Sequence, residues 1–559
     1  MRLPAIEDIP ASIVYTDVLL GYNHNRTIGN GEFFEMENLS SDEYPMMSPR
    51  KPRRFKRHFV KPHGIHSHEK MCWVDGTSFY YDGVVKGAVS DTDKQLVSMG
   101  AYVVIWPDKK IYNSKDATLK NLDVLDDAAE PAWTADPFEV SRITVSHEGK
   151  TQECMQIKTL KSADFRDGDV VTIKYQEWKS GSGDQGGELI DLELISHVFY
   201  AGELGSVKCV CLPYDEAFSS AYMSSLDYTD HYVTISRSIP SMDYICELGN
   251  RLWGCSTETN ELFCSALGDP FNWNVFNGDS QDSWAVNVGT TGPFTGVCAY
   301  QNSVLFFKED CIHVVYGTTP SNYQVSTISG QGVDDGSASS ICILNERVYY
   351  KSRRGICVFS GNQPSLISDA LGDVQYAGAT AAAFNDKIYV NMRAVFDPLD
   401  TEWDAPHGEL LVYDTVKGLW HKEGRESIRF LAVYDGNLFM VNENGDMYAV
   451  GPGTDGDSEA CVSWMARTGR LFFRTPDHKH ISKIKVRASL YDGTTLKIEI
   501  RYDGIGPWNP VAQKISRTRI GYVFPIIPRR CETFELRLTG SGDMRILGIS
   551  FTMEQGSEI

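Results

Sequence analysis

Paired cysteine motifs are missing from the sequence, although the chain of 559 residues contains 13 cysteines. The two nearest in sequence are Cys209 and Cys211, and no CxxC pair repeats, which argues against a zinc ribbon or a ferredoxin-type cluster. Most of these cysteines stand among apolar residues, and their number is odd. We therefore expect reduced thiols that pack as small apolar side chains, in a protein that folds in a reducing cytoplasm.

Long apolar runs are also missing. The best run, Ala101 to Trp106, is far too short to cross a bilayer. Residues 1–12 carry Glu7, Asp8 and two prolines and have no apolar segment of the kind that a signal peptide needs. We expect a chain without a membrane-spanning segment.

Positive charge is scarce, because 53 lysines and arginines face 74 aspartates and glutamates, a net charge of −21. This balance argues against a protein that binds DNA regardless of sequence. A GxSxG elbow, a Walker loop and an HExxH motif are all lacking, so nucleophilic, phosphoryl-transfer and zincin chemistry have no starting point, and a sialidase Asp-box is also missing. The sequence predicts no catalytic residue, no cofactor and no metal.

What the chain does contain is a degenerate repeat of apolar stretch, polar turn, strand, turn and strand. The first aliphatic residue after the turn recurs at intervals of 40 to 52 residues, and two weaker copies lie upstream, at Met71 to Tyr81 and Met99 to Trp106. This interval is the length of one four-stranded propeller blade, so we expect a six- or seven-bladed β-propeller. A set of unrelated β-meanders is the alternative. The five clear copies begin at Leu252, Val304, Val348, Ile388 and Leu438.

Three regions lie outside this period. Residues 1–60 are rich in Asn, Gly, Ser and Pro and predict an extended N-terminal arm. The stretch 114–230 has strands of its own and predicts a small inserted β domain. Apolar residues alternate cleanly with charged ones after residue 480, which predicts a C-terminal antiparallel sandwich over 461–559. The expected fold is therefore all-β, with blades at 61–113 and 231–455.

The sharpest charge feature is a segment, residues 50–57, in which six of eight positions are basic. Its cations could contact DNA phosphates or an acidic face of a neighbouring subunit, or they could form a solvated loop. The sequence leaves these three alternatives open. The candidate contact residues are Arg50, Lys51, Arg53, Arg54, Lys56 and Arg57.

Two further sets of side chains are weighed against plainer interpretations. Three histidines, His63, His66 and His68, lie close enough in sequence to suggest a metal, but a tract with Pro and Gly favours a solvated loop. A glycosidase would need a carboxylate pair, yet the acids of the propeller region stand in turn-like stretches that favour Asp for backbone reasons. The acids considered are Asp334, Asp335, Glu402 and Asp404.

In the predicted sandwich, Tyr502 and Trp508 are candidate platforms on which a glycan could stack. Trp508 is equally compatible with a place in the core.

Short phrases in order along nearly the whole chain resemble a family of phage and prophage structural proteins, called stabilisation or tail proteins. More distantly, the chain is similar to the tail-hub or nozzle proteins of short-tailed phages. The resemblance is strongest at Glu247–Gly254 and Leu267–Asn274. The other phrases are Gly21–Asn25, Gly31–Leu39, Tyr44–Arg50, Phe306–Asp310, Tyr316–Gly317 with Pro320–Asn322, Leu411–Thr415 with Gly418–His421, and Pro525–Arg530.

The resemblance implies a structural component of the phage virion, located in the tail, that assembles in the bacterial host cytoplasm. Nozzle proteins are propeller-based, form rings beneath the portal and close the DNA exit channel, so we expect a homo-oligomeric ring, with a hexamer favoured. The expected partners are portal, adaptor or tail proteins, with transient contact to packaged DNA. Two alternatives are a receptor-binding tail protein whose sandwich grips host glycans and a hydrolase that uses the propeller cavity.

Overall fold

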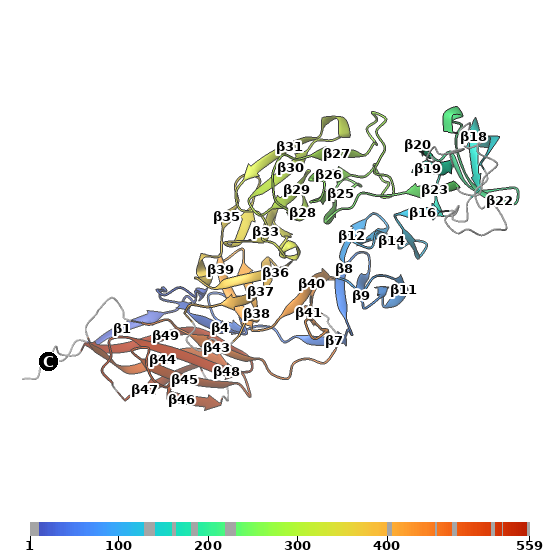
Figure 1. Ribbon diagram of the computed structural model, residues 1–559. Coiled ribbons are helices and arrows are strands. Elements are labelled where there is room, and N and C mark those ends of the chain that lie inside the picture. Colours follow the sequence, from blue (N-terminus) through green and yellow to red (C-terminus); the bar gives the residue numbers. More distant parts are fainter. Residues whose placement is uncertain are drawn as a thin grey trace, which may run out of the picture. The chain divides into compact units, whose positions relative to one another are not determined.

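The computed structural model consists almost entirely of β-strands (Figure 1). It describes residues 11–127, 140–158, 164–179, 188–218, 231–399, 405–452, 456–471, 478–515, 520–527 and 529–555. The chain divides into two compact units. The first comprises residues 1–75, 307–312 and 328–559, and the second comprises residues 76–306 and 313–327.

The repeat in the sequence corresponds to four-stranded sheets, and the β-propeller prediction is confirmed. Each of the five clear repeat copies begins in the second strand of a sheet, from Leu252 in β25 to Leu438 in β41. The described residues form seven blades, of which six are four-stranded sheets and one, β36–β39, is extended to six strands by β2 and β3.

In the first unit, three whole blades follow one another along the chain. Their first strands pack side by side, β32 on β36 and β36 on β40, and β40 also packs on β8 (Pro62–Ser67). The blades are β32–β35 (Cys342–Leu344, Arg347–Ser352, Gly355–Phe359, Ser365–Leu366), β36–β39 (Gln375–Phe384, Lys387–Phe396, His407–Asp414, Leu419–Gly424) and β40–β42 (Ile428–Tyr434, Asn437–Asn442, Asp446–Val450) with β7 (Arg54–His58).

In the second unit, β12–β15 and β24–β27 are whole blades, and β12 packs on β24. Their strands are Gln95–Met99, Tyr102–Trp106, Lys110–Asn113 and Thr118–Asn121, then Tyr244–Glu247, Leu252–Ser256, Glu261–Cys264 and Trp284–Asn287. The chain also forms the sheets β8–β11 (Pro62–Ser67, Met71–Asp75, Ser78–Tyr81, Val84–Ala88) and β28–β31 (Phe294–Tyr300, Ser303–Lys308, Cys311–Tyr316, Gln324–Ser329) in the same order.

Central blade strands are covered on both faces. All five residues of β25 are buried, as are six of the eight residues of β38. This explains why these strands show near-continuous apolar runs in the sequence instead of alternation.

The N-terminal segment expected as an extended arm is instead woven through the sheets of the first unit. Strand β1 (Ala11–Thr16) pairs with β49 of the sandwich, β2 (Gly21–Tyr22) joins β39, and β4 (Glu35–Glu37) pairs with β43. Strand β7 pairs with β42 and so completes the last blade. The short strands β3 (Glu32–Phe33), β5 (Leu39–Ser40) and β6 (Ser48–Pro49) lie between these pairings.

One position of this N-terminal segment requires glycine, because two backbones lie very close together there. Gly21 adopts a φ of 83°, and a Cβ built there would lie 2.3 Å from the carbonyl oxygen of Trp420. Only glycine lets β2 lie against β39 at this point.

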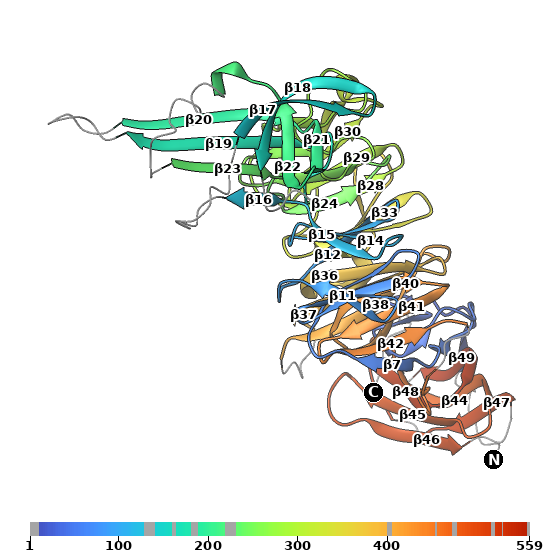
Figure 2. The same cartoon turned by 90° about the vertical axis from the view of Figure 1, so that its right-hand side faces the viewer.

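The inserted domain runs from β16 to β23, Val124 to Arg237, so it begins later than the expected residue 114 and also ends later than the expected residue 230. The difference arises because β15 completes the second blade and because β23 pairs with β16. Two sheets, β16-β23-β19-β20 and β17-β18-β22-β21, enclose its own apolar core (Figure 2). The strands are Val124–Asp127, Val140–His147, Lys150–Lys158, Val170–Lys179, Glu188–His197, Tyr200–Leu204, Val207–Pro213 and His231–Arg237.

The C-terminal region is the antiparallel sandwich that alternation predicts. One sheet has the order β1-β49-β44-β47 and the other β4-β43-β48-β45-β46. Inward residues such as Ile484, Ile498 and Leu538 are at most 1% exposed. The strands are Ser463–Arg467, Lys479–Leu490, Thr495–Tyr502, Asn509–Ile515, Ile520–Pro525, Phe534–Ser541 and Met544–Gln555, β43 to β49 in chain order.

All 13 cysteines are free. Within the described ranges, no helix is long and apolar enough to cross a membrane.

Candidate functional site

Two of the six cations in the basic segment 50–57 are buried in ion pairs. Arg50 is 6% exposed, and its two terminal nitrogens lie 2.7 and 3.0 Å from the carboxylate oxygens of Glu459. Arg53 is 2% exposed and pairs with Glu423 and Glu426. Neither guanidinium is therefore accessible to DNA or to another subunit. Both instead hold the N-terminal segment in place through ion pairs with acidic residues later in the same chain.

At Arg50 and at Glu423, burial and the neighbouring charges shift the pKa in opposite directions. Burial by itself lowers the pKa of Arg50, but the hydrogen bonds and negative charge of Glu459 outweigh it and raise that pKa. Burial also raises the pKa of Glu423, although Arg53 partly offsets this effect.

The other four cations are more accessible. Lys51 and Arg54 are exposed, and Lys56 is half-buried. Arg57 lies over the ring of Trp73, with its guanidinium carbon 4.6 Å from the ring centroid. The candidate contact residues on the surface are thus Lys51, Arg54, Lys56 and Arg57, just before and within β7.

A buried ionic cluster around Lys422 has no signal in the sequence. The Lys422 ammonium is 2.9 Å from Glu35 Oε1 and 2.6 Å from Glu409 Oε1, and Tyr376 donates a hydrogen bond of 2.8 Å to Glu409. Burial would raise the pKa of Glu409, but Lys422 and the hydrogen bonds hold it well below its ordinary value. His407 adds a further contact, 3.3 Å from Glu409.

This cluster contains a carboxylate pair, yet its geometry is structural. Glu35 and Glu409 are 8% and 5% exposed, and both accept hydrogen bonds from the same lysine. A glycosidase pair needs an open space between the two carboxyl groups, which the Lys422 ammonium fills here.

Among the acids and histidines singled out in the sequence, those that the structure describes do not assemble into a site. Asp334 accepts a hydrogen bond of 2.7 Å from Lys351, whereas Glu402 and Asp404 lie outside the described residues. His63 lies on β8 and is 4% exposed, and burial lowers the pKa of the neighbouring His66 to about 4. The part of the chain that the structure describes contains no group of three His, Cys, Asp or Glu placed to hold a metal ion.

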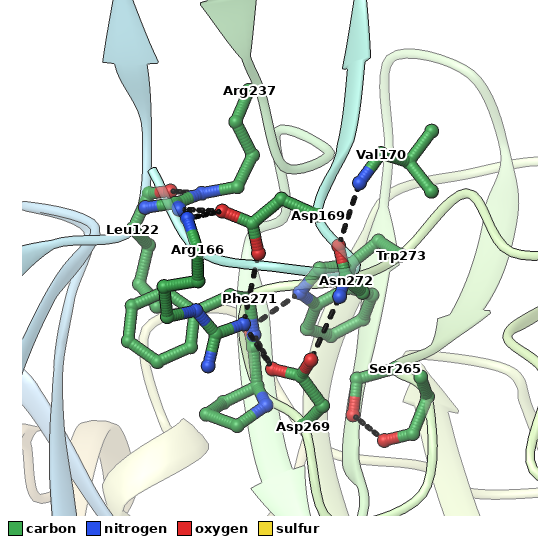
Figure 3. Close-up of polar contacts among 12 residues, drawn as sticks. Leu122, Arg166, Asp169, Val170, Arg237, Ser265, Asp269, Phe271, Asn272 and Trp273 are labelled. Carbon is green, nitrogen blue, oxygen red and sulfur yellow. Dashed lines mark hydrogen bonds and ion pairs between the residues drawn. The ribbon is translucent and has the colours of Figure 1, made fainter. Parts of the chain in front are cut away.

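A further, partly buried ionic cluster, the insertion latch, joins the inserted domain to the blade β24–β27 (Figure 3). We define it as Arg166, Asp169, Arg237, Asp269 and Asn272. Asp169 lies between two guanidinium groups, paired with Arg237 and 3.0 Å from Arg166. Arg166 also reaches Asp269 at 2.7 Å, and the Asn272 side-chain amide donates a hydrogen bond of 2.7 Å to Asp269.

Backbone contacts extend the latch. The Val170 amide donates to the Asn272 side chain, and Arg237 donates to the carbonyl oxygens of Asn121 and Leu122, next to β15. Phe271 provides a ring face for the Arg166 guanidinium, whose central carbon lies 3.8 Å from the ring centroid. The latch therefore fixes the inserted domain on its neighbouring blades at both ends of the insertion.

The two candidate glycan-stacking residues have different environments. Tyr502 is 7% exposed and packs in the sandwich core, so it offers no ring face to a sugar and we withdraw it from the candidate site. Trp508 is half-buried in the loop before β46 and does not belong to the core. Its ring lies 4.8 and 4.4 Å from the guanidinium carbons of Arg501 and Arg537.

No known protein family and no curated protein matches the sequence. Among solved structures, BamB from Moraxella catarrhalis is 9% identical, and the match covers 71% of this chain and 99% of that one with a TM-score of 0.33. The phage phi92 endosialidase is 12% identical over 81% of this chain and 70% of that one, with a TM-score of 0.25. An exo-β-1,3-galactanase from Phanerochaete chrysosporium is 10% identical over 55% and 94%, with a TM-score of 0.21. Because all three TM-scores lie below 0.5, we argue neither fold nor function from these likenesses.

Proposed function

We propose that this protein is a structural component of a phage tail, a nozzle, hub or connector that assembles as a homo-oligomeric ring and acts without catalysis. Portal, adaptor or tail proteins are its neighbours, and packaged DNA passes it during ejection. The chain folds in the host cytoplasm and then becomes part of the virion.

One observation carries this proposal: the phrases that resemble phage structural proteins supply the residues that hold the chain together. Glu35, in the phrase Gly31–Leu39, binds Lys422. Arg50 ends the phrase Tyr44–Arg50 and binds Glu459. Asp269, in the phrase Leu267–Asn274, belongs to the insertion latch. These phrases of the resemblance thus include residues that hold parts of this chain together, which supports a rigid part of an assembly.

The charge distribution supports the same role. The net charge is −21, and two of the six cations in the only strongly basic segment are neutralised internally. A surface of this kind attracts DNA weakly, so DNA could slide past without being held.

The first test is to delete the gene from its phage and to examine the particles by cryo-EM. We expect particles that package DNA but lose it, with wild-type complementation restoring retention. Maps of complemented particles should place six or twelve copies of the chain below the portal. Particles that form, retain DNA and infect normally without the protein would refute the proposal.

A second test addresses the exposed cations. The variant Lys51→Glu/Arg54→Glu should complement the deletion less well if these residues contact a neighbouring subunit. The matched control is Lys174→Glu, at a half-exposed lysine of the inserted domain. If the double variant retained DNA as well as the wild type does, Lys51 and Arg54 would not be contacts to a neighbouring subunit.

A further inference from the structure

The outer face of the sandwich sheet β1-β49-β44-β47 carries a row of three cations on β44 (Figure 1). Lys483, Lys485 and Arg487 are exposed. They alternate along the strand with Ile484 and Val486, which are fully buried in the core. Because successive side chains of a strand point to opposite faces, the three cations project from the same side of the sheet, about 7 Å apart.

This row of cations has no acidic partner among the described residues. Lys483 and Lys485 form no ion pair there, and Arg487 donates a hydrogen bond of 3.3 Å to the hydroxyl group of Tyr15. The residues opposite the cations in the register of the sheet are all uncharged: Thr552, Ser550 and Gly548 on β49, and Pro525 and Val523 on β47. The next carboxylate along β49, that of Glu554, is already paired with His480 at 2.9 Å.

Exposed apolar side chains flank the row on both neighbouring edges of the sheet. Ile13 on β1 is 73% exposed, and Val523 on β47 is 53% exposed. Ile13 lies opposite Thr552, which in turn lies opposite Lys483. Val523 lies directly opposite Lys485. Since residues opposite each other in an antiparallel sheet share a face, this face combines a positively charged centre with apolar margins.

We propose that this face binds an acidic surface of a second copy of the chain. The net charge is −21, so once the three positive charges of the row are set aside, the rest of the chain carries −24. Another copy therefore offers the complementary charge. Two copies that met through this same face would bring like charges together, so the contact is heterologous, the type of contact that can close into a ring. The inference rests on the proposed function and names a contact of its ring.

DNA suits this face less well than a protein does. Its phosphates would pair with the cations but would leave the side chains of Ile13 and Val523 without apolar partners. The strongly acidic remainder of the chain also repels a polyanion. A protein surface can satisfy both features at once, because protein interfaces bury apolar side chains and place opposite charges against each other.

The test measures self-association of the full chain by sedimentation velocity at low and at high salt. Wild type should associate, and high salt should weaken the association because it screens exposed charges. The triple variant Lys483→Glu/Lys485→Glu/Arg487→Glu should associate more weakly by about tenfold or more, since its face repels an acidic partner. The double variant Ile13→Ser/Val523→Ser leaves the charge unchanged and should also weaken the association, because it removes the apolar margins.

The matched control is Lys115→Glu/Lys120→Glu/Lys150→Glu, which changes the net charge by the same amount at three exposed lysines outside the sandwich. It should associate at least as tightly as wild type, and thermal unfolding verifies that each variant is folded. The inference is overturned if wild type stays monomeric, if the triple or the double variant associates like wild type, or if the control loses association equally. Wild type that binds DNA or heparin through this face without associating with itself would overturn it too.

Failure of this inference can be distinguished from failure of the proposed function. Phage particles that are normal without the protein would refute the tail role, but they would leave a salt-sensitive association through this face intact. Conversely, a ring that cryo-EM still resolves in particles complemented with the triple variant would refute this contact and leave the tail role standing.

Discussion

Asp169 and Arg237 form an ion pair in which both residues are almost fully withdrawn from water, at 0% and 2% exposure. Water cannot compensate either charge, so each depends on its partner. The pair lies at the centre of the insertion latch, and we therefore expect the attachment of the inserted domain to depend on it.

The variant Asp169→Ala should lose about 3–5 kcal/mol of unfolding free energy, because the Arg237 guanidinium is left buried without its main partner. Urea unfolding measures the loss, and hydrogen exchange should become faster in β19 and β23. The control is Glu193→Ala, which breaks a pair with Lys174 in the same domain where both side chains are 50% exposed. Its loss should stay below about 1 kcal/mol. Similar losses for the two variants would show that the latch is not what holds the domain.

Replacing Lys422 with Met should destabilise the first unit by about 3–5 kcal/mol at pH 7, because Glu35 and Glu409 lose the cation that both of them bind. In the wild type the pKa of Glu409 lies below 4.5, so its stabilising contribution is present above pH 4.5 and is lost as the pH falls further. In the variant, burial favours the protonated form of Glu409, because Lys422 no longer stabilises its charge. The difference between the two proteins should therefore shrink below about pH 4.5, as unfolding curves at pH 7 and pH 4 can measure. If the two proteins differed in unfolding free energy by the same amount at pH 7 and pH 4, the lowered pKa of Glu409 would be contradicted.

Burial lowers the pKa of His421 to about 3. The unfolded chain takes up a proton on this residue below its ordinary pKa of 6.5, whereas the folded chain does not, so stability is lost as the pH falls from 6.5 toward 3. From pH 7 to pH 5 this amounts to about 2 kcal/mol. Neither ring nitrogen of His421 has a hydrogen-bond partner among the described residues.

The substitution His421→Phe should therefore make the protein more stable at pH 5 than the wild type, and the gain should be smaller at pH 7. Denaturant unfolding at both values gives the comparison. An equal effect of the substitution at the two pH values would show that this imidazole does not titrate as described.

Of the 13 cysteines, Cys461 alone should react rapidly with a thiol reagent in the folded protein. Cys461 is exposed, Cys342 is half-buried, and the rest are buried. Burial raises the pKa of Cys342 to about 12, which leaves it protonated and unreactive at pH 8. A maleimide should modify one thiol of the folded chain and all 13 in urea, with the fast reaction lost in Cys461→Ser. Rapid modification of several thiols in the folded chain would contradict the packing described.

The sequence predicts those parts of the fold that depend on local patterning. Apolar strands and polar turns recur at blade length, and each anchor residue such as Val348 lies in the second strand of a blade. Alternation from Ile484 to Leu490 likewise predicts a sandwich strand with one buried face, and β44 is that strand.

Pairings between distant parts of the chain leave no such pattern. Strand β4 is three residues long and pairs with β43, more than 400 positions away. The run of cations at 50–57 resembles a solvated segment, and only the fold reveals that Glu459 and Glu423 bind Arg50 and Arg53. The Lys422 cluster is equally hidden, because a buried lysine is recognised only once its partners are known.

The pairing of β7 with β42 has a consequence for how the chain matures on the ribosome. His58 is opposite Asp446, so the hydrogen-bonding edge of β7 has no partner until about 390 further residues have been made. At typical rates of about 5–20 residues per second, that interval lasts roughly 20–80 seconds. During this time an unsatisfied strand edge is available to wrong neighbours. The blades made in between can form first, but the last one closes only after β42 has been made, so a chain that stops before β42 would carry an open edge and be prone to aggregate.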